Sequence, residues 1–146
     1  MEEINSSDLI IFSIGSLYTS IIPHLLSSEV VKAIDKSKAK ILYTCNAVGQ
    51  VFETEGYTVS DHVKMINKYL GKRKVDAVIA ADSNLPSEVL DKYISVENKS
   101  LVKVDKNKLD EMGCELILED LLVIEDNYIR HDDLKFATCI FNYLMR

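Results

Sequence analysis

The amino-acid sequence predicts an α/β protein with a Rossmann-like layered fold, in which helices cover both faces of a mainly parallel sheet. Short runs rich in β-branched residues alternate along the chain with segments of helical period. Three of these runs are almost continuously apolar, as expected of parallel strands that are covered on both sides. With 146 residues, five glycines, two prolines and no linker-like tract, the chain is expected to form one domain over residues 1–146.

Five short apolar segments bounded by polar or turn residues are predicted to form strands. They are 8–14, 39–45, 76–81, 101–104 and 114–118. The fourth segment is the shortest, and all five lie between stretches of helical or turn-forming sequence. The order of the segments therefore predicts repeated strand-to-helix connections, which is the pattern of a parallel sheet.

Helices are predicted in the intervening segments 17–26 running on to about 37, 59–70, 86–96 and 132–145. Thr58 and Asp61 have the spacing of a capping box, and Gly71 is placed to end the second helix in a left-handed conformation. Pro86 suits the first turn of the third helix, and Asp132 is a natural N-cap for the last helix. The last helix carries a broad apolar stripe and is expected to lie against the sheet; the stripe consists of Leu134, Phe136, Ala137, Ile140, Phe141 and Leu144.

Composition and charge exclude several classes of protein. Seventeen basic against 23 acidic residues give a net charge of −6, whereas a general nucleic-acid binder needs a basic face. Cys45, Cys114 and Cys139 are far apart and lack zinc-ligand spacing, so we expect reduced core thiols. No apolar run approaches the ~20 residues of a membrane-spanning helix, and no signal sequence is evident. We therefore expect a cytoplasmic protein without membrane insertion.

A strand end followed by glycine and hydroxyl residues is the first candidate binding segment. Gly15 follows the predicted strand 8–14, and Ser16, Thr19 and Ser20 open the next helix. Such a turn directs backbone N–H groups and the positive end of a helix at one point, where a phosphate can bind. One glycine is weaker support than a full glycine-rich fingerprint, so an ordinary capped turn is the alternative.

The second candidate is the long polar loop after the predicted strand 39–45. In open α/β sheets, ligands bind outside the carboxyl ends of the strands. The candidate ligand-binding residues of this loop are Asn46, Gln50, Glu53, Thr54 and Tyr57. The residues nearest the following helix have a structural explanation as capping or first-turn residues; they are Thr58, Ser60, Asp61 and His62.

Several short words of this sequence occur in the same order in one known family. They are Gly15-Ser-Leu-Tyr-Thr-Ser-Ile-Ile-Pro23, Ser37-Lys-Ala-Lys40, Cys45-Asn46 followed by Gln50 and Glu53-Thr54, Gly56-Tyr-Thr58, Ser60-Asp-His-Val63 and Ile129-Arg-His-Asp132. Over essentially all of its length, the chain resembles the C-terminal half of bacterial gluconeogenesis factors of the CofD-like (phospholactate transferase) superfamily. Several words matching in order make the resemblance specific to this family.

The resemblance implies a regulatory protein that binds a nucleotide sugar, with UDP-N-acetylglucosamine as the leading candidate. The cellular role that it implies is regulation between central carbon use and cell-wall synthesis, and with it cell shape. Tyr93 would then stack on the uracil, and the fork of Arg130 would hold the diphosphate through two parallel hydrogen bonds. From the residues alone, Tyr93 is instead an aromatic at the edge of the core and Arg130 a solvated surface charge.

Two departures from the family pattern indicate an incomplete site. The family's glycine-rich strand-to-helix turn, which cradles nucleotide phosphates, has no counterpart in this chain. Ser13-Ile14 and Val51-Phe52 stand where the family has Gly-Pro and Pro-Gly, so bulkier residues occupy positions of close approach. We therefore expect a homo-oligomer, or association with a missing N-terminal half.

Two other functions are kept as alternatives to nucleotide-sugar binding. In the first, the intact protein is a transferase of the phospholactate type that acts on a nucleotide-activated donor with the help of Mg²⁺. In the second, the chain is an assembly fragment without a ligand. His131-Asp132 suggests a general base, but no nucleophile accompanies it and no catalytic residue is predicted. Five acidic residues could suggest a magnesium site, but their spacing favours a solvated strand edge; they are Glu115, Glu119, Asp120, Glu125 and Asp126.

Overall fold

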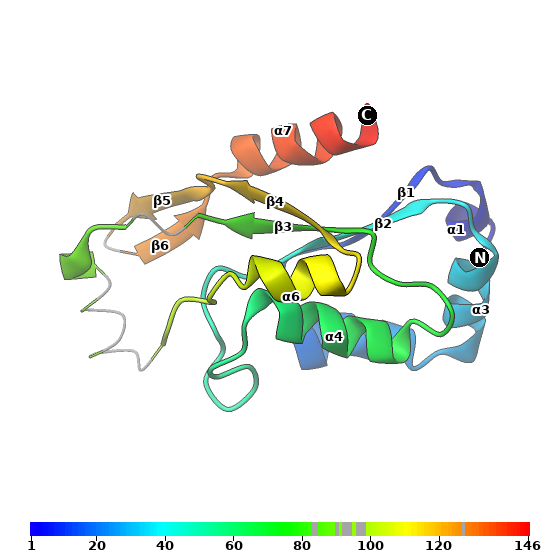
Figure 1. Ribbon diagram of the computed structural model, residues 1–146, viewed down its shortest axis with the longest axis horizontal. Helices are drawn as coiled ribbons and strands as arrows, with labels where there is room; N and C mark the ends of the chain where they lie inside the picture. The colour runs from blue at the N-terminus through cyan, green and yellow to red at the C-terminus, as the bar shows by residue number, and fades with distance from the viewer. Residues whose placement is uncertain (83–84, 90, 92–94, 96–98, 127) are drawn as a thin grey trace.

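The computed structural model describes residues 1–82, 85–89, 91, 95, 99–126 and 128–146. Its strands are β1 (Leu9–Phe12), β2 (Lys40–Thr44), β3 (Ala77–Ala81), β4 (Glu115–Glu119), β5 (Leu122–Glu125) and β6 (Tyr128–His131). Its helices are α1 (Glu2–Ser6), the π-helical turn η1 (Leu17–Ile21), α2 (Ile22–Leu25), α3 (Ser28–Lys36), α4 (Val59–Tyr69), α6 (Lys106–Glu111) and α7 (Asp133–Leu144). Figure 1 shows their arrangement.

The first four strands form one parallel sheet in the order β1-β2-β3-β4. The strands β5 and β6 form a separate antiparallel hairpin, in which Leu122 pairs with His131 and Glu125 with Tyr128. The predicted α/β fold with a mainly parallel sheet is therefore confirmed. In Figure 1 the hairpin lies beyond one end of the sheet, on the side where β3 and β4 also point.

Helices cover both faces of the sheet, but unequally. One core cluster joins β2 and β3 to η1, α2, α3, α4 and α6, and it includes Leu17, Ile34, Ile66 and Leu109, each at most 2% exposed. The other joins the opposite face of β2, β3 and β4 to the hairpin residues Leu122 and Ile129 and, among the described helices, to α7, which contributes Phe136 and Tyr143. Figure 1 shows α7 on one side of the sheet and α4 with α6 on the other.

Four of the five predicted strands form, whereas the prediction of a strand over 101–104 is wrong. In that segment, Leu101 and Lys103 make only isolated bridges, to Val48 and Thr58 in the loop after β2. Val102 is buried in the core, so its apolar character reflects packing beneath that loop. An apolar run of four residues does not by itself distinguish a strand from a buried connection.

The predicted continuous helix over 17–37 is divided into η1, α2 and α3. The new start at α3 has a local cause, because the Ser27 side chain accepts a hydrogen bond from the Val30 N–H and caps the helix. The sequence did not indicate α1, α6 or the hairpin of β5 and β6. The predicted helix over 86–96 falls in part outside the described residues, since 90, 92–94 and 96 are among those not described.

The boundaries of α4 and α7 follow the predicted capping chemistry. Thr58 and Asp61 form a complete capping box at the start of α4, and Gly71 follows its end with a φ of +74°. Asp132 caps α7, where its side chain accepts a hydrogen bond from the Lys135 N–H at 3.0 Å. Local hydrogen bonding thus fixes the ends of both helices.

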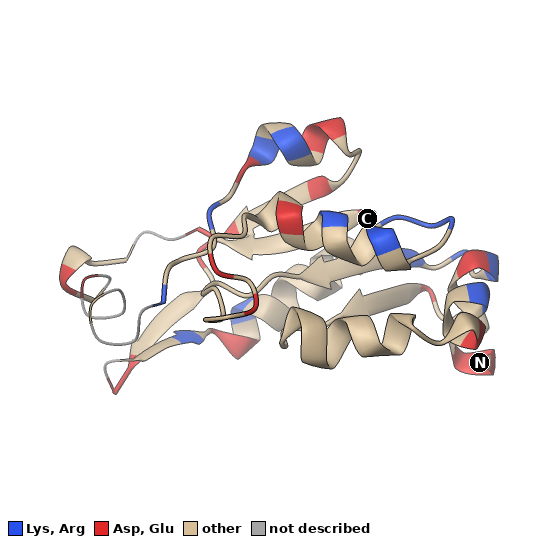
Figure 2. Ribbon diagram, turned by 90° about the horizontal axis from the view of Figure 1, so that it is seen from below, with Lys and Arg blue, Asp and Glu red and all other residues tan. Residues whose placement is uncertain are grey.

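The three cysteines are free thiols, with Cys45 and Cys114 buried and Cys139 partly buried. Burial raises the pKa of both Cys45 and Cys114 to about 12, so these two thiols stay protonated. Both α4 and α6 carry basic as well as acidic residues (Figure 2). None of the helices in the described part of the chain combines the length and the apolar character that a membrane span requires.

Candidate functional site

The carboxyl ends of β1 and β2 meet at one edge of the sheet. The side-chain amide of Asn46, just after β2, donates a hydrogen bond of 2.8 Å to the backbone carbonyl of Gly15, just after β1. The two predicted binding segments therefore lie side by side, as the parallel sheet requires. This edge is also where open α/β sheets bind their ligands.

The hairpin of β5 and β6 places Arg130 and His131 beside these strand ends. One cavity of about 770 Å³ lies between the hairpin, the residues Ser13 and Ile14 after β1, and the start of α7. A second cavity of about 480 Å³ lies between the hairpin and the loop after β2, including Asn46 and Gln50. Ile129 and His131 line both cavities. We call the residues Asn46, Gln50, Ile129, Arg130 and His131 the rim site.

Two buried polar atoms of the rim site have no hydrogen-bond partner. They are Oε1 of Gln50 and Nε2 of His131, and both residues line the smaller cavity. Burial lowers the pKa of His131, which favours the neutral imidazole. Its ring packs edge to face against Phe136, with the ring centroids 5.1 Å apart. Buried polar groups are normally satisfied, so unpaired ones beside a cavity indicate a place for a polar ligand.

Arg130 contributes an exposed cation to the larger cavity. Its side chain is 61% exposed, and its Nε lies 3.7 Å from an Oε of Glu125 on the neighbouring strand. An exposed ion pair of this length is weak, so the guanidinium can leave Glu125 for a ligand at little cost. The arrangement fits both predicted roles, the solvated surface charge and the anion-binding fork.

The turn from Gly15 to Ser20 has the geometry of an ordinary capped turn. The Thr19 N–H donates to Ser16 Oγ at 3.1 Å, and the Ser20 N–H donates to the Ser16 carbonyl at 2.9 Å. Ser16 Oγ in turn donates to Glu53 Oε2 at 2.6 Å. Because these donors are already used and a carboxylate lies beside them, a phosphate would have to displace Glu53 from the turn.

Two other predicted binding residues support the loop after β2. Thr54 is 1% exposed, and its Oγ1 accepts a hydrogen bond from the Gln50 N–H at 3.0 Å. The Tyr57 hydroxyl lies 2.7 Å from the Tyr18 hydroxyl, and this hydrogen bond raises the pKa of Tyr18 to about 12. Thr54 therefore helps to hold Gln50 in place, whereas Tyr57 points toward η1 and α4. Tyr93 lies outside the described residues.

The polar residues at the start of α4 have the predicted structural role. Ser60 donates to Asp105 from both its N–H and its hydroxyl, at 3.0 and 2.5 Å, and this joins the starts of α4 and α6. His62 is 1% exposed, and its Nδ1 donates to the Thr58 carbonyl at 2.9 Å. Its Nε2 is unpaired, but the ring is packed between Tyr43 and Tyr57 and lines none of the described cavities.

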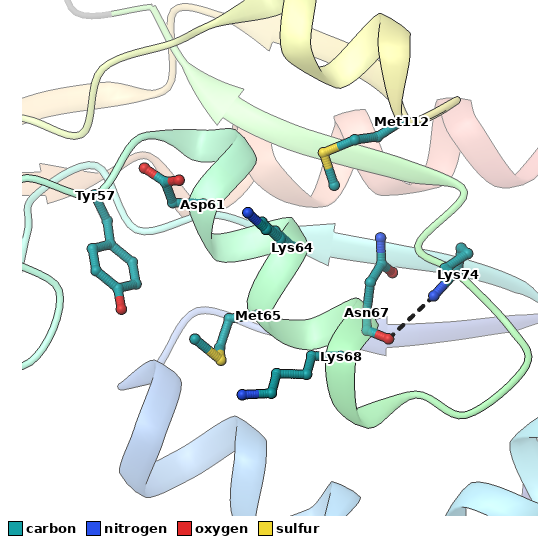
Figure 3. A pocket seen from close by; sticks show the side chains of 8 residues that line it. All are labelled: Tyr57, Asp61, Lys64, Met65, Asn67, Lys68, Lys74 and Met112. Atoms are coloured by element: carbon teal, nitrogen blue, oxygen red, sulfur yellow. Dashed lines mark hydrogen bonds between the residues drawn. The ribbon is translucent and has the colours of Figure 1, made fainter.

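A groove of about 770 Å³ runs along the outer side of α4 (Figure 3). Two of its polar groups are already in use, since Asn67 Oδ1 accepts from the Val75 N–H and Asp61 belongs to the capping box. Lys74 Nζ donates to the Asn67 carbonyl at 3.4 Å. The groove is lined by Tyr57, Asp61, Lys64, Met65, Asn67, Lys68, Lys74 and Met112. None of these lining residues carries one of the unpaired buried polar atoms found among the described residues, in contrast to the rim site.

Sequence reasoning missed Ile129 and His131 as members of the site. His131 was weighed only as a general base, and the segment around it was expected to be the approach to the last helix. Exposed and half-buried residues alternate over β6 in the structure, but in the sequence Ile129 is the one aliphatic residue of this segment, which is too little to predict a strand. In the described part of the chain, no group of three or more His, Cys, Asp and Glu side chains is arranged to hold a metal ion.

Fold and rim site together define an α/β protein with a candidate small-molecule site at the carboxyl ends of parallel strands. The family model for 2-phospho-L-lactate transferase CofD matches residues 1–122, so the chain belongs to the CofD family. The resemblance to this family that the sequence predicted is thereby confirmed.

Gluconeogenesis factors are among the similar proteins. That of Bacillus subtilis is 36% identical over 144 residues, which are 99% of this chain and 45% of the relative. That of Listeria monocytogenes is 34% identical, again over 99% of this chain and 44% of the relative. A crystal structure of a protein from Bacillus halodurans matches with a TM-score of 0.89 and 35% identity, covering 96% of this chain and 45% of that chain. The chain thus spans about 45% of the length of these relatives.

Proposed function

We propose that the rim site binds a nucleotide sugar, with UDP-N-acetylglucosamine as the leading candidate, and that the protein acts as a regulator without chemistry of its own. The observation that carries this proposal is the pair of unpaired buried atoms, Gln50 Oε1 and His131 Nε2, beside one cavity at the carboxyl ends of the strands. The family resemblance supplies the regulatory role, between central carbon use and cell-wall synthesis with cell shape.

The chemistry of the rim site suits the parts of such a ligand. Gln50 and the neutral His131 offer neutral hydrogen-bonding groups of the kind that recognise sugar hydroxyls or a base edge. Arg130 offers the planar donors that suit a diphosphate. The Glu53 carboxylate already accepts a hydrogen bond from the Ser16 hydroxyl and would repel a phosphate. Arg130 is therefore a better binding group for the diphosphate than the turn after Gly15. The metal-assisted transferase remains an alternative that no described cluster of carboxylates favours.

The test is a titration of the 146-residue chain with UDP-N-acetylglucosamine, followed by NMR of the backbone amides. NMR detects weak binding, which is expected because the chain spans only about 45% of its relatives. The expected result is a saturable shift of Asn46, Gln50 and the residues 129–132, which Gln50→Met weakens. As the matched control, Lys68→Ala in the α4 groove should leave the titration unchanged. Shifts confined to that groove, or insensitive to Gln50→Met, would reject the proposal.

A further inference from the structure

Phe52, at the tip of the loop between β2 and α4, has an exposed side chain on a fixed and unfavourable backbone turn. The residue is 97% exposed, more than any other large apolar residue in the described part of the chain, and its φ is +67°. Bulky side chains rarely adopt this left-handed conformation. The Gln50 carbonyl accepts hydrogen bonds from the N–H groups of Glu53 and Thr54, at 3.1 and 2.9 Å, and these bonds close the turn around Phe52. An aromatic ring that gains no packing within the chain, on a backbone held in one turn, has the form of an interface anchor.

The charged groups next to Phe52 are acidic and have no cationic partner. Glu55 is exposed, and the half-buried Glu53 accepts a hydrogen bond from the Ser16 hydroxyl at 2.6 Å. Among the described residues, neither carboxylate forms an ion pair. We call residues 52–55 the acidic tip. It presents one aromatic ring beside two negative charges.

The groove along the outer side of α4, or α4 groove, has the opposite character (Figure 3). Its apolar wall consists of three partly buried side chains that pack on the core from outside, namely Tyr57, Met65 and Met112. Three lysines also line the groove, and none of them forms an ion pair with a described carboxylate; they are Lys64, Lys68 and Lys74. The acidic lining residue, Asp61, belongs to the capping box of α4. Methionine side chains pack well against aromatic rings, so this groove suits an aromatic residue that is accompanied by carboxylates.

We propose that two copies of this chain form a two-fold dimer in which Phe52 of each copy inserts into the α4 groove of the other. The acidic tip and the groove lie on the same side of the sheet, because Tyr57 belongs to the loop that carries Phe52 and also lines the groove. Figure 1 shows this loop projecting on the side of α4. Phe52 does not occupy the groove of its own chain, since the residue faces solvent. Each copy can therefore give and receive the same contact, which is the pattern of a two-fold interface.

Charge and rigidity both favour this pairing of tip and groove. The chain has a net charge of −6, so two copies repel each other unless their contact surface brings opposite charges together. Two carboxylates of the acidic tip would meet a groove with three lysines and one aspartate. The backbone hydrogen bonds to Gln50 already fix the turn, so little ordering is required on association. The dimer is independent of the proposed ligand, because neither Phe52 nor the α4 groove belongs to the rim site.

The first test measures the dimer by sedimentation equilibrium of the 146-residue chain. The unmodified chain should dimerise at high micromolar concentration, and Phe52→Gly should raise the dissociation constant at least about tenfold, because it removes the anchor from both contacts. Glycine accommodates the positive φ of the turn, so this variant should keep the fold, which circular dichroism checks. The matched control is Phe141→Ala on α7, on the opposite face of the sheet, where Phe141 is 61% exposed. It should leave the dissociation constant unchanged.

The second test exchanges charges between tip and groove at exposed positions. Glu55→Lys in one chain, and Lys64→Glu with Lys68→Glu in another, should each weaken the homodimer, because like charges then meet at both contacts. An equal mixture of the two variants should form a heterodimer, since both of its contacts again join opposite charges. Sedimentation velocity with one variant fluorescently labelled measures this.

Four outcomes would overturn the proposal. They are an unmodified chain that stays monomeric at high micromolar concentration, a dimer that Phe141→Ala weakens as much as Phe52→Gly does, a mixture that associates no more than its components, and a dimer that responds to the lysine substitutions but not to Phe52→Gly. The last result would show that a different surface of the second copy occupies the α4 groove.

Discussion

The start of α4 and the rim site both carry polar side chains near the carboxyl ends of the strands, yet they differ in how their groups are used. At the start of α4, Ser60 bonds to Asp105 and so joins α4 to α6, while Thr58 bonds to Asp61 within the helix cap. At the rim, Gln50 Oε1 and His131 Nε2 are buried without partners beside a cavity. Polar residues alone therefore do not mark a binding site; unsatisfied ones beside open space do.

The largest effect is expected from Asp105→Ala, which tests the structural character of the α4 start. The substitution leaves the N–H and hydroxyl of Ser60, a residue only 3% exposed, without their acceptor. Leaving such groups unsatisfied should lower the free energy of unfolding by about 2–4 kcal/mol. Urea denaturation measures this. Asp105→Asn should lower the free energy of unfolding by less. The control is the exposed Asp110→Ala, whose free energy of unfolding should stay within about 0.5 kcal/mol of that of the unmodified protein. An equal, small loss for all three variants would contradict the structural assignment.

Arg130→Ala tests the functional character of the rim. It should weaken UDP-N-acetylglucosamine binding by ~1.5–3 kcal/mol if a charge-assisted, two-pronged contact is lost, and Arg130→Lys should weaken it less. The same substitution should change the free energy of unfolding by no more than about 0.5 kcal/mol, because its ion pair with Glu125 is exposed. NMR titration gives the affinity and urea denaturation the stability. Unchanged affinity would remove Arg130 from the site.

A pH dependence of stability is expected from the two buried histidines. Burial lowers the pKa values of His62 and His131 in the folded protein, so the unfolded chain binds protons more readily. The stability should be fully present above the unfolded pKa of about 6.5 and should decline as the pH falls below it. His62→Asn, which keeps a donor for the Thr58 carbonyl, should flatten this decline, as measured by urea denaturation at several pH values. An unchanged slope would show that His62 is not among its causes.

The smallest effect is expected from Gln50→Met on stability. Because Gln50 Oε1 has no partner, its loss removes no hydrogen bond made by that atom, and the unfolding free energy should change by less than about 1 kcal/mol or rise slightly. The backbone hydrogen bond from Gln50 to Thr54 is retained. Thermal and urea unfolding measure the change. A loss comparable to that of Asp105→Ala would show that Gln50 is as structural as the start of α4, and the contrast between the two regions would fail.

The sequence by itself determined those features that depend on neighbouring residues. Thr58 with Asp61 predicted the start of α4, and Asp132 predicted the start of α7, because a cap is made within one helical turn. Runs of apolar residues predicted four strands of the parallel sheet. Because all carboxyl ends of a parallel sheet lie together, parallel pairing of these strands places Gly15 and Asn46 at one edge.

Only the tertiary structure decided which polar residues remain unsatisfied. His131 lines a cavity with Gln50 because the hairpin of β5 and β6 folds back beside the loop after β2, and no local pattern specifies that meeting. Likewise, Val102 is apolar because it packs under that loop, although its short run resembled a strand. Helix caps and hydrophobic periodicity depend on residues that are close in sequence, so the sequence predicts them. Cavities and sheet edges depend on segments that come together only in the folded protein.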